Sequence, residues 1–413
     1  MCTPFVRLWI SSLTDKAIRE GLRNLENGSK YDNLFLAAKA RSESDWLVGI
    51  NGTQALTIAA GHGTYSVGRV QTPTLGMVCE RYWENRRFTP EAFWQLHIAV
   101  DGNNDGTVKL SSSGKWKEKE PATVLYNKVK EAGTAAVTKV ERKEKTEETP
   151  LLFDLTTLQK EANARHGFTA EQTLGIAQKL YEKKLVTYPR TGSRYIPDDV
   201  FAEIPKLLAF IGAMPEWKGK VQVKAGPTRR SVDGGKVTDH HALLVTGEKP
   251  LFLSKEDNTV YQMIAGRMIE AFSEKCVKDT TTVTAECAGA EFTVKGSVIR
   301  QAGWRAVHGE EDKEEISIPN WQEGDTLTLK GCSITEGKTK PKPLHTEATL
   351  LSAMETAGKE IENDALRQAL KDCGIGTPAT RAAIIETLFK RGTWNAARNR
   401  SYLPRKDLRC IRS

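Results

Sequence analysis

The sequence contains no pair of cysteines at a spacing that binds metal. Its seven cysteines are scattered singly through 413 residues, with no C-x-x-C and no histidine spacing that would close a tetrahedral zinc site. We therefore expect no zinc module, and we predict reduced, mostly structural thiols. The cysteines are Cys2, Cys79, Cys276, Cys287, Cys332, Cys373 and Cys410.

Long apolar runs are also missing. No stretch is long enough to cross a membrane, and the N-terminal letters MCTPFVRLWISS lack the basic region, apolar stretch and small-residue cleavage site of a signal peptide. We therefore expect no membrane partner and a cytoplasmic location. With 39% hydrophobic and 27% charged residues the composition is typical of a soluble globular protein, and the length predicts two to four domains.

Acidic residues are outnumbered by basic ones. Sixty lysines and arginines stand against 52 aspartates and glutamates, which gives a net charge of +8 and a pI ≈ 9.0. A basic surplus favours an anionic partner such as nucleic acid. Many basic proteins bind no nucleic acid, however, so charge alone leaves the two interpretations equally weighted.

The spacing of apolar residues alternates between two patterns along the chain. Helical spacing covers 13–66 and 151–192, whereas period-two alternation begins near Phe93 and returns over 278–334 before a helical pattern resumes near 341. This order predicts that strands far apart in sequence share one sheet of an inserted domain. Two mixed-charge runs are expected to be solvated strands or loops: 117–120 and 139–148.

The stretch KKLVTYPRTGSRY, which begins at Lys183, places a tyrosine just beyond a helical pattern. The helix is expected to end near Lys184, because LVTYP holds β-forming residues followed by a proline that disfavours helical geometry at Tyr188. In an extended segment residues two apart point to the same side, so we expect Arg190 to share a face with the tyrosine.

A tyrosine at such a place is by itself more often packing material than a nucleophile. A phenol with a pKa near 10 attacks poorly at neutral pH and needs a nearby cation or base. Arginine is suited to holding a phosphate with two parallel hydrogen bonds. The combination of Tyr188 and Arg190 is therefore compatible with attack on a phosphodiester.

A second candidate cluster is TDHHALL, which contains His240 and His241. The simplest interpretation is a capped helix start with exposed imidazoles. Adjacent histidines on a helix do not face one another, so a joint metal site is not expected. One histidine could still contact a phosphate or relay a proton.

Two further stretches suit anion binding at the start of a helix. YSVGRVQTPTLGMV and CGIGTPATRAAIIETLFKRG each combine glycines with a proline that fits a first helical turn, and each is equally explained as helix capping. The candidate contacts are Arg69, Gln71, Thr377, Thr380 and Arg381.

Taken together and in order, these stretches resemble the type IA DNA topoisomerases, in particular their topoisomerase III-like branch. The resemblance extends from about Arg7 to Gly392 and rests on RLWISSLTDKAI, SVGRVQTPTL, TLQKEANARHGF, LVTYPRTGSRY, DHHAL, HTEATLLSAME and GIGTPATRA. It implies a DNA topoisomerase that cleaves one strand through a 5′-phosphotyrosine intermediate, passes a strand and religates the cut. The implied partner is single-stranded or underwound duplex DNA in a nucleoid-associated cytoplasmic enzyme.

The resemblance also implies a role for each candidate residue. Tyr188 matches the tyrosine that takes the 5′ phosphate, Arg190 the arginine that stabilises the phosphate, and His240 the first position of the H-x-A motif. The remaining five candidates match the regions that hold the single strand: Arg69, Gln71, Thr377, Thr380 and Arg381.

The implied fold is an α+β multidomain toroid. It consists of a helical base, a β-rich arch and a helix-turn-helix-like domain that carries the tyrosine, without the toprim α/β domain with which the family begins. The expected divisions are 1–20 for the end of the toprim domain, 21–90 with 341–413 for the base, 91–150 with 246–340 for the arch, and 151–245 for the tyrosine domain.

The sequence departs from the family at the acidic part of the site. The toprim domain carries an Asp-x-Asp pair for Mg²⁺, yet no Asp-x-Asp occurs here, so magnesium is expected for the family while its ligands are not in this chain. The C-terminal stretch after Gly392 also lacks zinc-ribbon cysteines. We expect a separate toprim-containing chain or a helicase as a partner.

Three interpretations differ in what the chain does alone. It is a topoisomerase, or a catalytically impaired remnant that only binds single-stranded DNA, or another tyrosine-using DNA enzyme. The third is disfavoured, because a relaxase needs a His-x-His metal motif and a recombinase places its tyrosine after the histidine and arginine, whereas the histidines here follow Tyr188. On its own the chain is expected to bind DNA but to relax supercoils poorly.

Overall fold

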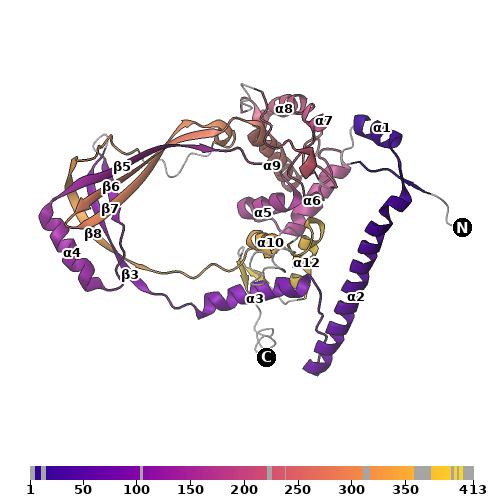
Figure 1. Cartoon of the computed structure of the whole chain (residues 1–413), viewed down its shortest axis with the longest axis horizontal. Coiled ribbons are helices and arrows are strands. Elements are labelled where there is room, and N and C mark those ends of the chain that lie inside the picture. Colours follow the sequence, from indigo (N-terminus) through magenta and orange to yellow (C-terminus); the bar gives the residue numbers. More distant parts are fainter. Residues whose placement is uncertain are drawn as a thin grey trace.

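A computed structural model describes residues 5–10, 15–102, 106–220, 226–237, 239–309, 317–357, 374–391, 395–397 and 400–402. The described elements trace a ring, with a strand-rich arch on one side and a helical body on the other (Figure 1). Two limbs join the halves: one leads from the arch to α3 and α10, the other to α5 and α9. Within the described ranges, no helix is both long enough and apolar enough to span a bilayer.

The arch is a closed six-stranded antiparallel barrel in the order β3-β4-β7-β6-β5-β8. Its apolar core includes Leu96, Ile98 and Val100, which alternate along one strand and are fully buried. The prediction that strands far apart in sequence share one sheet is confirmed. The strands are β3 (Ala92–Asp101), β4 (Thr107–Ser112), β5 (Thr134–Glu147), β6 (Cys276–Cys287), β7 (Ala290–Gln301) and β8 (Thr326–Lys338).

One helix of the arch was not expected from the sequence. The run 117–120, predicted as a strand or loop, leads into α4 (Lys119–Ala132). Ala122, Leu125, Tyr126 and Val129 recur at helical spacing and pack against the barrel core. The charged residues at the start of the helix made this apolar pattern hard to recognise in the sequence. The second mixed-charge run lies in strand β5, as predicted.

The segment that contains Tyr188 folds around a second core. Helix α9 is buried along most of its length, although the division 246–340 assigned it to the arch. Its side chains pack with those of the 151–245 segment, and the barrel strands resume only at Cys276. The helices are α5 (Leu155–His166), α6 (Ala170–Glu182), α7 (Asp198–Phe201), α8 (Ile204–Gly212) and α9 (Lys255–Phe272).

The base shares its core with the segment that carries the tyrosine. Leu155 of α5 and Leu174 of α6 are buried together with side chains from α3 (Gln71–Arg87), α10 (Glu347–Thr356) and α12 (Pro378–Lys390). Glu347 of α10 also accepts a hydrogen bond at 2.7 Å from the backbone N–H of Ala170, which begins α6. The two parts therefore meet across both apolar and polar contacts.

Helix α2 (Asp32–Ala60) lies apart from the helical body (Figure 1). None of its 29 residues is buried. It nevertheless exposes large apolar side chains on several sides, and a helix that is apolar all round is ordinarily covered. The exposed apolar residues of α2 are Leu34, Phe35, Leu36, Trp46, Leu47, Val48, Ile50, Leu56 and Ile58.

The remaining elements are short. Near the N-terminus lie β1 (Val6–Arg7), α1 (Asp15–Arg23), β2 (Glu26–Asn27) and η1 (Gly28–Tyr31). Single 3-10 turns occur at η2 (Pro215–Trp217), η3 (Gly234–Lys236) and η4 (Gly303–Val307), and a small hairpin joins β9 (Asn395–Ala397) to β10 (Arg400–Tyr402).

Candidate active site and nucleic-acid interface

Tyr188 lies on an extended segment that runs antiparallel to the segment containing His240. Val186 bridges to Val245, the Thr187 N–H donates to the Leu244 carbonyl at 2.9 Å, and the Thr191 hydroxyl donates to the His240 carbonyl at 2.7 Å. The expectation of a helix start at the two histidines is therefore wrong. The pairing of the two segments, which lie about fifty residues apart, brings His240 to the tyrosine.

The phenol ring of Tyr188 is half-buried between two aromatic neighbours. Its centroid lies 4.6 Å from that of the His240 imidazole and 5.2 Å from that of Tyr181, which is on the last turn of α6. The Tyr181 ring meets Tyr188 edge-on, an arrangement favoured by the charge distribution of aromatic rings. The two neighbours restrict the ring while leaving the residue accessible.

A cavity of about 510 Å³ opens beside this tyrosine. His241 lines it, and burial lowers the pKa of that imidazole, which therefore stays neutral at pH 7. Its Nδ1 lies 2.7 Å from the Ala242 carbonyl, which can only accept, so Nδ1 carries the proton and Nε2 keeps a lone pair. The lining residues are Ile10, Tyr181, Glu182, Lys184, Val186, Thr187, Tyr188, His240, His241 and Thr246.

Arg190 is not among the residues that line this cavity. Its side chain is exposed, and no hydrogen bond or ion pair joins it to Tyr188 in the described part of the chain. The turn between them is closed by the Thr191 N–H, which donates to the Pro189 carbonyl at 2.9 Å. The structure therefore brings Tyr188 and His240 together and leaves Arg190 outside the contact.

Arg69 and Gln71 lie at the start of α3. The Arg69 guanidinium pairs with the Asp45 carboxylate of α2 at 3.0 Å, and both side chains are exposed. Such a surface pair is weak, so the arginine can exchange partners at little cost. The Gln71 amide oxygen accepts a hydrogen bond at 3.0 Å from Arg391, which also donates to the Ser66 hydroxyl.

Thr377 and Thr380 form a reciprocal cap at the start of α12. The Thr377 N–H donates to the Thr380 hydroxyl at 3.0 Å, and the two hydroxyls lie 3.0 Å apart. Pro378 occupies the first turn, as the sequence predicted. Both threonine side chains are used in capping, yet both residues remain partly accessible at the helix terminus.

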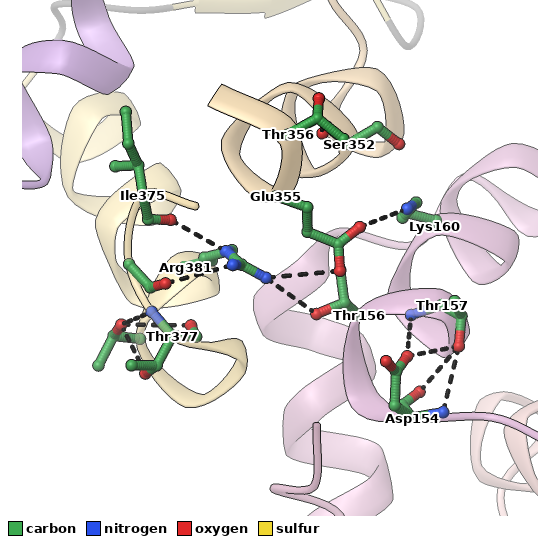
Figure 2. Close-up of polar contacts among 12 residues, drawn as sticks. Asp154, Thr156, Thr157, Lys160, Ser352, Glu355, Thr356, Ile375, Thr377 and Arg381 are labelled. Atoms are coloured by element: carbon green, nitrogen blue, oxygen red, sulfur yellow. Dashed lines mark hydrogen bonds and ion pairs between the residues drawn. The ribbon is translucent and has the colours of Figure 1, made fainter. Parts of the chain in front are cut away.

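Arg381 is buried, unlike the other predicted DNA contacts. Figure 2 shows its guanidinium between the loop at Ile375 and the side chains of Thr156 and Glu355. Its guanidinium donates to the Ile375 carbonyl at 3.0 Å, the Gly376 carbonyl at 3.2 Å and the Thr156 hydroxyl at 3.4 Å. It also pairs with Glu355 at 3.5 Å, and Glu355 binds Lys160 at 2.7 Å. Arg381 thus holds the loop in the described structure, and its contact with DNA stays a prediction.

The loop before α12 requires glycine. Gly374 and Gly376 have φ of 59° and 70°, a region that side chains rarely adopt. A Cβ on Gly374 would lie 2.6 Å from the Met354 carbonyl oxygen, and one on Gly376 would lie 3.1 Å from Val70. Close backbone packing therefore fixes the shape of this loop.

The three candidate motifs lie next to one another. A Cβ on Gly192, in the tyrosine loop, would lie 3.4 Å from Pro378 of α12, and the loop before α12 contacts Val70 beside Arg69. Segments near residues 70, 190 and 376 therefore meet at one place. This contiguity was not evident from the sequence, where each stretch could be interpreted separately as a helix cap.

The described residues do not provide a magnesium site. Nowhere in the described ranges do three or more His, Cys, Asp or Glu side chains gather closely enough to hold a metal ion. Mg²⁺ prefers carboxylate oxygens, and among the described residues Glu182 is the only carboxylate that lines the tyrosine cavity. The residues present therefore do not fit the ion.

The ordered motifs and the ring of helices and barrel have a counterpart among known proteins. The sequence model of the family described as DNA topoisomerase matches residues 29–407. The chain belongs to the type IA DNA topoisomerases. The α+β toroid fold that the resemblance implied is thereby confirmed.

Several type IA topoisomerases are similar over most of this chain. DNA topoisomerase 3 of Bacillus subtilis is 39% identical over 403 residues, covering 94% of this chain and 55% of that protein. The Bacillus licheniformis enzyme of the same name is 38% identical with the same coverage. The structure of full-length topoisomerase I from Thermotoga maritima superposes with a TM-score of 0.73 at 25% identity, covering 96% of this chain and 63% of that one. The chain thus spans about half the length of the curated topoisomerases it matches.

Several residues around this site were not found from the sequence. Lys184 and Tyr181 line the tyrosine cavity, and Glu355 and Lys160 complete the Arg381 network. The position of Lys184 four residues before Tyr188 offered a weak signal. The long-range partners offered none, because their contacts span about two hundred residues.

Proposed function

We propose that the chain carries the strand-cleaving half of a type IA topoisomerase. In this proposal Tyr188 attacks one phosphodiester of single-stranded DNA, the strand is held open, another strand passes, and the cut is religated. The observation that carries the proposal is the position of Tyr188, a half-buried phenol at a cavity that also contains His240, on a segment whose Gly192 lies next to Pro378 of α12.

The proposed cleavage is a balanced exchange at phosphorus. The Tyr188 oxygen forms a bond to phosphorus, and the bond to the 3′ oxygen breaks, which leaves a 5′-phosphotyrosine and a free 3′ hydroxyl. The phenol loses its proton and the departing oxygen gains one. The neutral His241 and the neighbouring His240 are the groups of the cavity suited to proton exchange at this place. Religation is the same exchange in reverse.

The path of the strand follows from the contiguous motifs. Arg69 lies in an exposed ion pair that a phosphate can displace, and Thr380 is exposed at the start of α12. Arg190, exposed beside the tyrosine, is proposed to bind the phosphate when DNA is present. Arg381 acts by keeping the loop in place.

The proposal includes a protein partner. No carboxylate cluster is found within the described ranges, so the toprim chemistry of the family has to come from outside them. The uncovered apolar surface of α2 suits a folded domain, and Asp45 and Arg69 lie at its border. We propose a toprim-containing polypeptide as the occupant, and a helicase remains the second candidate partner.

Trapping the covalent intermediate tests this function. Purified chain is mixed with a single-stranded oligonucleotide labelled at its 3′ end, with and without a separately expressed toprim domain, and then denatured in detergent. A labelled protein band is expected with the toprim domain present, whereas a 5′ label should leave on a shorter fragment. Tyr188→Phe should abolish the band, and Tyr181→Phe, which alters a neighbouring phenol, should retain it.

The competing function is single-stranded DNA binding without cleavage. It is favoured by the missing carboxylate cluster within the described ranges. Binding by every variant with no adduct under either condition would establish it. In a plasmid relaxation assay with magnesium we expect little relaxation by the chain alone, and complete relaxation at catalytic amounts would contradict the need for a partner.

A further inference from the structure

Lys184 has a backbone conformation that lysine rarely adopts. Its φ is 58°, in the left-handed region, and it follows the last turn of α6. The Lys184 N–H donates to the Tyr181 carbonyl at 2.8 Å, and the Leu185 N–H donates to the Leu180 carbonyl at 2.9 Å. This pair of bonds is the Schellman arrangement, in which glycine ordinarily occupies the left-handed position.

Lysine at this position brings the fold no packing advantage. The residue is exposed, and a glycine would make the same two backbone bonds without the steric strain of a Cβ. Its carbonyl accepts a hydrogen bond from the Thr246 hydroxyl, which glycine would also permit. A strained residue that contributes nothing to the core is a candidate for function.

One cationic side chain lies in the cavity beside Tyr188. Among the described residues that line it, Lys184 is the one ammonium and Glu182 the one carboxylate, whereas His241 is neutral. Gln178 donates to the Glu182 carboxylate at 3.1 Å, whereas no ion pair joins the Lys184 ammonium to any carboxylate of the described chain. The ammonium is therefore available to an anion that enters beside the phenol.

We propose that Lys184 is a positioning residue that binds a phosphate of the single strand next to the scissile one. Lysine serves such a site as a compact charge on a flexible stem and needs no bidentate geometry. The inference rests on the proposed function, because the strand must lie in the tyrosine cavity. In this proposal the strained backbone at the end of α6 is retained because the lysine side chain binds substrate.

The proposal predicts that one variant is more stable than the unaltered chain and yet binds DNA more weakly. Lys184→Gly removes the strain and the charge together, so the thermal midpoint should rise by about 1–2 °C while DNA binding weakens. Binding of a labelled mixed-sequence oligonucleotide, measured by fluorescence anisotropy on the full chain, should weaken about three- to tenfold. The slope of log affinity against log salt should fall by roughly 0.7, the value for one phosphate of a single strand. Lys184→Arg should keep both affinity and slope.

Matched variants separate the effect of the Lys184 charge from a general loss of positive charge and from a general relief of backbone strain. Lys183→Ala removes an equal charge from the adjacent residue, which does not line the cavity, and should bind nearly as the unaltered chain does. Ala288→Gly relieves the same backbone strain, at φ of 52°, in the β6–β7 turn and should raise the midpoint without changing binding. Lys184→Asn removes the charge with a residue that tolerates this conformation, should glycine impair folding.

The outcomes distinguish this inference from the proposed function. Unchanged affinity and slope in Lys184→Gly, or an equal loss in Lys183→Ala, would overturn the role of Lys184 and leave the Tyr188 adduct experiment untouched. Failure of the unaltered chain to bind any single-stranded DNA would overturn both. Loss of binding in Lys184→Gly with an unchanged salt slope would indicate a structural role instead.

Discussion

In the tyrosine cavity the polar groups face open space, whereas in the loop before α12 they face one another. Lys184 and His241 line a cavity of about 510 Å³, and Arg190 is exposed nearby. Arg381, by contrast, is buried and makes hydrogen bonds to two loop carbonyls and a threonine, with Glu355 as its anionic partner. Both regions lie on the same surface.

The difference separates two roles for cations at one interface. A buried guanidinium that is hydrogen-bonded to two loop carbonyls fixes the shape of that loop, and turning it toward a ligand would break those bonds. An exposed cation without such partners is available to bind an anionic ligand. We therefore expect substitutions at the buried Arg381 to affect folding and substitutions at the exposed cations to affect binding.

The largest effect should come from Arg381→Met. The variant removes the bonds that hold Ile375 and Gly376 and leaves Glu355 with Lys160 alone, so we expect a loss of about 3 kcal/mol in the free energy of unfolding. Denaturant titration measures it. Arg190→Met, the matched exposed arginine, should leave stability unchanged while weakening DNA binding. Equal destabilisation by both variants would remove the distinction.

Gly376→Ala should have the next largest effect. The left-handed backbone and the approach to Val70 and Arg381 predict a loss of about 1–3 kcal/mol, accompanied by weaker DNA binding. Gly61→Ala is the control, because that residue has the same φ of 70° and no neighbour within 4 Å of an added Cβ. If both glycines behave alike, packing against Val70 is irrelevant to the loop.

Acid should lower the free energy of unfolding through protonation of His345. Burial lowers the pKa of this imidazole, which precedes α10, to about 4. In the unfolded chain this imidazole binds a proton near pH 6.5, whereas in the folded chain it stays neutral until the pH approaches 4. Its contribution to the free energy of unfolding is therefore fully present above pH 6.5 and is lost as the pH falls toward 4. We expect a loss on the order of 1–2 kcal/mol between pH 7 and pH 5. His345→Gln should flatten this part of the stability profile, and an unchanged profile would exclude His345 as its source.

The smallest change in stability is expected for Arg69→Ala. The exposed pair with Asp45 contributes little to folding, so the unfolding midpoint should remain the same within error. DNA affinity should nevertheless fall, with a lower salt slope, in an anisotropy titration. Asp45→Ala frees the arginine and should strengthen binding. A lower affinity in Asp45→Ala would indicate that the ion pair itself shapes the site.

The sequence predicted the local parts of this site better than its assembly. The end of α6 near Lys184, the proline in the first turn of α12 and the threonine cap follow from residue preferences and were predicted or compatible with them. The pairing of the Tyr188 and His240 segments depends on backbone bonds across about fifty residues, which no spacing rule reports.

The features that the sequence did not reveal have the same origin. Arginine in a first helical turn is typical of an anion site, and only the positions of Thr156 and Glu355 show that Arg381 points inward. Helix α9 was placed with the arch because it lies next to strands in the sequence, whereas its buried side chains belong to the other core. Burial is a property of the tertiary fold, so local patterns do not determine it.

The two limbs of the arch are hydrogen-bonded ribbons. Ala92 pairs with Lys338 at the base of one, and Glu147 pairs with Cys276 at the base of the other. A force that draws the arch away from the helices pulls both strands of a ribbon from the same end, so their two backbones share the load and the ladder keeps them side by side. Mechanical stiffness is therefore highest along the limbs, and bending concentrates where the ribbons end, at the junctions with α3, α5, α9 and α10.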